Sequence, residues 1–171
     1  MEYIGSPPFP IYLKYDGIFD LDALYRRCVK WFHEYGFEFE ETAYKGKADE
    51  IELKWAPWMK VNDYIMYKLA LNFHILEYKD INVVKDGRKV KLTKARMRVE
   101  ISMGLETDYS KRFGGNKFAQ QIKKFYERFI LKKEMEAYYE DQLYYYMHKL
   151  YNVMKEFLDT ETKTNAFYDN W

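Results

Sequence analysis

Residues 95–105 read ARMRVEISMGL, and this stretch decides the fold class of the 171-residue chain. Its apolar side chains recur at every second position and are separated mostly by charged or polar ones. This period places the apolar side chains on one face of an extended strand. Residues 64–77 follow the same pattern. Strands with one apolar and one polar face predict an antiparallel sheet that is covered on one side only.

Shorter segments with the same alternation lie around these two. A first strand is expected at 11–15, and further strands are expected at 37–40, 51–55, 81–85 and 88–92. The last two flank Asp86 and Gly87, a pair typical of a two-residue type I′ hairpin. We therefore predict a first strand, a helix, and then an antiparallel meander of about six strands.

The helix is expected at 21–35, where apolar side chains recur at helical spacing. Asp20 stands at the N-cap position, and Gly36 stands where a glycine commonly ends a helix. Cys28 lies on the apolar face. It is the only cysteine, so it cannot form an intrachain disulfide, and we expect a buried, unreactive thiol.

A very long C-terminal helix is expected because neither proline nor glycine occurs from Asn116 to Leu158. About 40 residues would make roughly 60 Å of helix, whereas a compact domain of this size is about 40 Å across. The helix must therefore either break near 132–136 and fold back, or project toward a partner. For the second case we predict a partner interface formed by its second apolar stripe, which comprises Tyr139, Leu143, Met147, Leu150, Met154 and Phe157.

Charge is balanced over the whole chain but not along this helix. Lys and Arg number 28 against 27 Asp and Glu. Residues 111–133 contain eight Lys or Arg and one Glu, a net charge of +7, whereas 134–161 contain two Lys and seven acids, a net charge of −5. Two antiparallel copies would bring opposite charges together, which predicts a homodimer. The alternative is that both halves are solvated faces.

Four regions follow from these patterns. They are a proline-rich lead-in at 1–10, an α+β sheet domain of two layers at 11–131, a helical extension at 132–159, and a polar tail with aromatic residues at 160–171. No window approaches the ~20 apolar residues that span a bilayer, and no signal sequence is evident. A cytoplasmic protein is expected.

Catalytic chemistry finds little support in the sequence. His33, His74 and His148 fall in different elements and share no metal-ligand spacing, so we predict neither a catalytic residue, a metal nor a cofactor. Lys111, Arg112 and Lys117 surround a Gly-Gly pair before a helix start, and they are the residues that would contact an anion there.

The basic segment 111–133 also contains five aromatic residues, which leaves two further alternatives. Cationic tracks with aromatics bind single-stranded nucleic acid, and basic amphipathic helices lie on membrane surfaces. The spacing of the phenylalanines argues against both, because it predicts that they cover the sheet.

The order of elements in 11–131 resembles the helix-grip fold of the START and polyketide-cyclase-like superfamily. The resemblance rests on element order, not on a motif, and this chain departs from it in having one helix after the first strand and in the length of its last helix. It implies an apolar ligand cavity beneath the C-terminal helix. The expected lining is Trp55, Tyr67, Phe73, Met97, Met103, Ile122 and Tyr126. The alternative is an ordinary filled core.

These observations favour a non-enzymatic interaction or assembly protein that uses its C-terminal helix to bind a copy of itself or another protein. A small domain that binds an apolar ligand is the second hypothesis. An enzyme or a nucleic-acid binder is the third.

Overall fold

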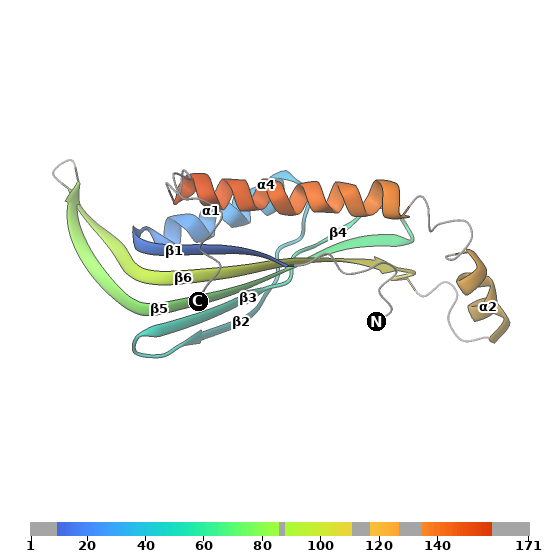
Figure 1. Cartoon of the computed structure of the whole chain (residues 1–171), viewed down its shortest axis with the longest axis horizontal. Helices are drawn as coiled ribbons and strands as arrows, with labels where there is room; N and C mark the ends of the chain where they lie inside the picture. The colour runs from blue at the N-terminus through green and yellow to red at the C-terminus, as the bar shows by residue number, and fades with distance from the viewer. Residues whose placement is uncertain (1–9, 86–87, 111–116, 127–134, 159–171) are drawn as a thin grey trace, which may run out of the picture.

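A six-stranded antiparallel sheet forms one layer of the structure, and helices cover one of its faces (Figure 1). The computed structural model describes residues 10–85, 88–110, 117–126 and 135–158. The strands are β1 (Ile11–Phe19), β2 (Glu41–Gly46), β3 (Glu50–Trp55), β4 (Trp58–Lys60), β5 (Ile65–Lys85) and β6 (Arg88–Thr107). The helices are α1 (Leu21–Glu34), α2 (Lys117–Tyr126), the π-helix η2 (Met135–Glu140) and α4 (Asp141–Phe157). The predicted α+β class is confirmed.

The sheet order is β1-β6-β5-β3-β2, with β4 paired to β5. The first and last strands are neighbours, since Ile11 pairs with Ile101 and Phe19 with Thr93. The remaining strands follow one another as a meander. This order puts β5 and β6 in the centre, and their alternating apolar side chains form the floor of the core.

β5 and β6 are each one continuous strand where the sequence predicted two separate strands. A bulge between Leu76 and Lys79 shifts the register of β5, and Glu77 has a φ of 55° within it. The extra residue moves the following side chains to the other face of the sheet. The alternation of apolar and polar residues is therefore interrupted, and the sequence pattern indicates a strand end where the strand in fact continues. Beyond the bulge the two strands curve together toward the helical side (Figure 1).

β2 and β4 lie outside the predicted strands. Most side chains of β2 are exposed, so it lacks the apolar alternation by which a strand is recognised. Of the strand expected at 37–40, a single bridge from Glu38 to Trp58 is present. β4 lies between the strands that were expected at 51–55 and 64–77.

α1 agrees with the sequence. The Asp20 side chain accepts a hydrogen bond from the Ala23 backbone N–H at 2.8 Å, and Gly36 has a φ of +78°, which only glycine adopts without strain. Leu24, Cys28, Trp31 and Phe32 are buried. Burial raises the pKa of the Cys28 thiol to about 12, so the thiol is protonated and inert at neutral pH.

An aromatic cluster joins α1 to the sheet. Trp55 of β3 lies at the centre, with its ring centroid 4.4 Å from that of Phe73 and 4.9 Å from that of Tyr25. Phe32 and Phe39 pack around the same indole. Edge-to-face contacts of this kind add to the burial of apolar area. These aromatic side chains therefore belong to the core or pack directly against it.

The C-terminal region is not one straight helix. α4 runs along the sheet beside α1, whereas α2 lies beyond the end of the sheet (Figure 1). The position predicted for a break, 132–136, falls mostly outside the residues that the structure describes. η2 leads directly into α4, and the hydroxyl of buried Tyr67 donates a hydrogen bond to Gln142 Oε1 at 3.0 Å, which ties the start of α4 to β5.

The stripe assigned to a partner interface is instead part of the core. Leu143, Met147, Leu150 and Met154 are buried and pack with β-sheet and α1 residues in one cluster, while Tyr139 is half-buried and Phe157 is partly exposed. The prediction was wrong because a helical period shows that a stripe is buried but not what buries it. The boundary at 131/132 likewise separates α4 from a core that it helps to form.

Candidate functional site

The residues expected to line an apolar cavity do not form one. Trp55, Tyr67, Phe73 and Met97 each expose 2% of their surface or less. A side chain that lines an empty ligand-sized space would expose surface to that space, so these four belong to a filled core.

The remaining three expected lining residues lie elsewhere. Met103 is half-buried beside the core, Ile122 is exposed on α2, and Tyr126 is the last residue of α2. The expectation failed because α4, not α2, is the helix that lies over the sheet.

α2 presents large apolar side chains to solvent. Phe118, Ile122 and Phe125 are 67%, 44% and 59% exposed. They follow one another at i, i+4 and i+7, so they share one face of the helix. The expectation that these phenylalanines cover the sheet is wrong. Two helices, α1 and α4, already cover it.

The charges of α2 are all positive. Its ten residues include Lys117, Lys123 and Lys124 and no acid. Lys123 Nζ lies 3.6 Å from Oδ2 of buried Asp108, directly after β6. The backbone N–H of Asp108 donates to the Tyr64 carbonyl at 2.7 Å, which fixes this carboxylate at the end of the sheet. One face of the helix is thus held toward the domain by an ion pair.

The residues proposed to contact an anion are only partly described. Lys111 and Arg112 lie outside the described residues, and Lys117 begins α2.

A shallow cleft of about 240 Å³ opens between the start of α1 and the curved part of β5 and β6. Its lining is Asp20, Leu21, Asp22, Tyr25, Tyr44, Leu53, Tyr78, Asp80, Lys91 and Thr93. None of the seven expected pocket residues is among them.

The charged groups that line this cleft already have partners. Lys91 Nζ lies 2.7 Å from Asp80 Oδ2, and the Tyr78 hydroxyl donates to Asp80 Oδ1 at 2.5 Å. The hydrogen bonds from Lys91 and Tyr78 lower the pKa of Asp80, and the bond to Asp80 raises the pKa of Tyr78. Asp22 pairs with Arg26 at 2.9 Å. A ligand entering here would have to displace satisfied contacts.

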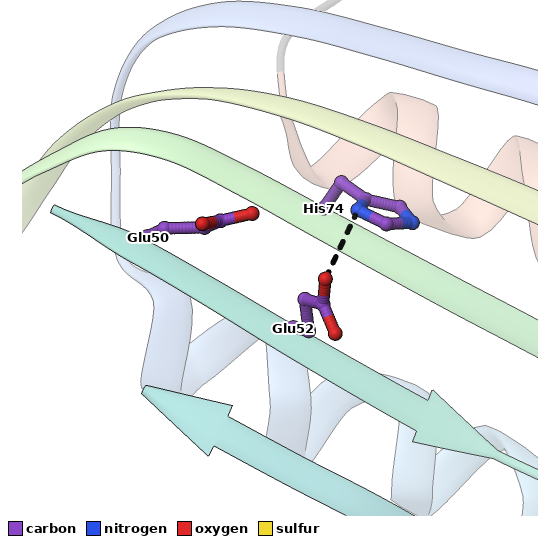
Figure 2. A group of neighbouring side chains, drawn as sticks. All are labelled: Glu50, Glu52 and His74. Atoms are coloured by element: carbon purple, nitrogen blue, oxygen red, sulfur yellow. Dashed lines mark ion pairs between the residues drawn. The ribbon is translucent and has the colours of Figure 1, made fainter. Parts of the chain in front are cut away.

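A third group lies on the polar face of the sheet, away from the helices. Glu50, Glu52 and His74 bring their ligand atoms within 4.8 Å of one another (Figure 2). The sequence did not indicate this group, because His74 is more than 20 positions away from both glutamates. Only the β3–β5 register, in which Glu52 pairs with His74, brings them together.

No protein-family model, curated protein or solved structure matches this chain. Among the helices in the described part of the chain, none is long and apolar enough to cross a membrane. A functional assignment therefore rests on the geometry of these surfaces.

Proposed function

We propose that this protein is a non-enzymatic binding protein that docks on anionic membrane surfaces through α2. The observation that carries the proposal is the exposed face of Phe118, Ile122 and Phe125 on a helix whose charges are all lysines. An apolar face with aromatic side chains and a lysine-rich remainder is the composition of helices that lie in the membrane interface.

The position of α2 supports this proposal. The spacing of its phenylalanines predicts a helix that covers the sheet, and such a helix would not be available to a membrane. α1 and α4 provide that cover, and α2 lies at the opposite end of the sheet from the curved β5–β6 hairpin (Figure 1). Its apolar face can therefore enter a lipid surface without disturbing the core.

The expected strength of binding is modest. Full burial of a phenylalanine or isoleucine side chain contributes about 1.5–3 kcal/mol, so three side chains that are each about half exposed contribute about 3–4 kcal/mol together. Each lysine near an anionic surface adds about 1 kcal/mol. The total binding free energy is similar to that of a single fatty-acyl anchor, which gives marginal and reversible membrane binding. The +7 charge of 111–133 makes binding depend on anionic lipid and on salt.

The face of α2 fits lipid better than it fits the other partners of a basic aromatic segment. Single-stranded nucleic acid needs successive planar rings for base stacking, whereas an aliphatic Ile122 stands between the two phenylalanines. A groove on a protein partner would accept the same i, i+4, i+7 anchors. The lysines distinguish the two cases, because lipid binding must increase with the fraction of anionic headgroups.

Vesicle sedimentation tests the proposal directly. The full chain is mixed with vesicles of phosphatidylcholine alone and with vesicles containing 30% phosphatidylserine, at 0.1 M and 1 M salt. We expect sedimentation with the anionic vesicles at low salt, and we expect the double variant Phe118→Ser, Phe125→Ser to lose most of it. The matched control is Tyr145→Ser, which removes an aromatic side chain 66% exposed on α4.

Two results would refute the proposal. One is no sedimentation of the wild-type chain with anionic vesicles. The other is equal sedimentation of the double variant and the Tyr145 variant. Circular dichroism establishes that all variants are folded, and a parallel titration with a single-stranded oligonucleotide separates lipid binding from general affinity for polyanions.

A further inference from the structure

We infer that Glu50, Glu52 and His74 form a binding site for one divalent transition-metal ion of the Zn²⁺ type on the polar face of the sheet. This site is independent of α2 and of the proposed docking surface. Glu50 and Glu52 are two residues apart on β3, so their side chains leave the same face. His74 lies directly opposite Glu52 on the neighbouring strand β5.

The directions of the side chains support a shared ligand. Figure 2 shows the imidazole of His74 and the carboxylate of Glu52 pointing toward one another, with the Glu50 carboxylate directed toward the same space. All three come from strands within the sheet, whose hydrogen bonds hold the backbone in place. Only side-chain rotations separate the three groups from a common centre.

The separation between His74 and Glu52 indicates what that centre can hold. His74 Nδ1 lies 4.0 Å from Glu52 Oε1, which is too long for a hydrogen bond of about 2.7–3.2 Å. One ion bonded at about 2.1 Å to both atoms bridges up to about 4.2 Å, and a tetrahedral ion brings them to about 3.4 Å. The side chains of Glu52 and His74 are 30% and 46% exposed, so they are free to make this adjustment.

The chemistry of the donors selects the ion. One imidazole nitrogen and two carboxylate oxygens suit Zn²⁺ and its neighbours, whereas Ca²⁺ and Mg²⁺ prefer oxygen ligands alone. Three protein ligands on a solvated face leave further positions for water.

Neighbouring residues orient the ligands and also compete with the ion. Lys47 Nζ lies 3.2 Å from Glu50 Oε2, which holds that carboxylate while its second oxygen remains available. On the neighbouring strands, Lys45 lies opposite Glu52 in the β2–β3 register, and Arg98 lies opposite His74 in the β5–β6 register. These cations disfavour a second metal ion, so the expected stoichiometry is one ion per chain.

Calorimetric titration of the untagged full-length chain with Zn²⁺ tests the inference. We expect one ion per chain, and we expect Glu52→Gln and His74→Asn each to weaken binding by about tenfold or more. The matched control is His33→Asn, which removes an exposed histidine on α1 and should leave the affinity unchanged. Excess Mg²⁺ or Ca²⁺ should not displace the ion.

Three outcomes would overturn the inference. They are no Zn²⁺ binding by the folded wild-type chain at 100 μM metal, loss of binding in the His33 variant, and wild-type affinity in the His74 variant. Because the titration contains no lipid, its failure would leave the vesicle result standing, and the reverse also holds. Near-ultraviolet circular dichroism of the core tryptophans verifies that each variant is folded.

Discussion

Replacing Leu150 with alanine tests whether α4 belongs to the core of a single chain. Leu150 is fully buried and lies in the cluster that unites α4, α1 and the sheet. Leucine-to-alanine changes at such sites cost about 3–5 kcal/mol, since they lose transfer free energy and leave a cavity. Domains of this kind have about 5–15 kcal/mol of stability. The variant should remain folded but lose a large fraction of that margin.

The assay is urea unfolding followed by tryptophan fluorescence, because Trp31 and Trp55 report on the same core. In a thermal melt followed by the same fluorescence signal, the melting temperature should fall by roughly 10 °C, at about 2–4 °C per kcal/mol. Tyr145→Ala is the control, because it removes an exposed side chain from the same helix and should change stability by less than about 0.5 kcal/mol.

A cost below about 1 kcal/mol for Leu150→Ala would refute this placement of the side chain, and so would a cost that shrinks as the protein is diluted. The second result would mean that Leu150 packs against another copy. Measuring the midpoint at two protein concentrations also tests the predicted homodimer, which stays a prediction.

Two further predictions concern α1. Asp20→Ala removes the cap that binds the Ala23 N–H and should cost about 1 kcal/mol, whereas Asp20→Asn should retain most of the stability; equal losses in urea unfolding would contradict a capping role. Burial, and then the hydrogen bond to Glu41, raise the pKa of Tyr25 from 10.0 to about 12. The folded state therefore binds the proton of the Tyr25 hydroxyl more tightly than the unfolded state does. The stability that this proton contributes is fully present below pH 10 and is lost as the pH rises from 10 to 12. Tyr25→Phe should reduce the fall in the urea midpoint between pH 8 and pH 11, and an unchanged fall would exclude Tyr25 as its cause.

The elements that sequence reasoning predicted well have local causes. The cap at Asp20, the glycine at Gly36 and the apolar spacing between them define α1 without reference to the rest of the chain. The alternation in 95–105 predicts both a strand and the face that it buries, and the structure confirms both in β6. The absence of proline and glycine after Asn116 predicted helix, and helix forms in α2, η2 and α4.

The features that were not predicted from the sequence depend on contacts between residues far apart in the chain. β2 has no apolar alternation and exists because it pairs with β3. The bulge after Leu76 is a feature of the β5–β6 register. The proposed metal ligands are adjacent only because Glu52 and His74 pair across strands. The resemblance to the helix-grip fold stays a prediction, and the apolar cavity that it implied is occupied by core side chains.

The sequence by itself determined which side chains are apolar stripes and which face of each element they occupy, because the periods of strands and helices are properties of the backbone. The sequence could not determine which apolar stripe packs against which other element, because that depends on contacts between distant segments. Tertiary structure alone decided that the stripe of α4 closes the core, while the apolar side chains of α2 are exposed at the end of the sheet. The physical reason is that α1 and α4 lie side by side over one face of the sheet and bury their stripes against it (Figure 1).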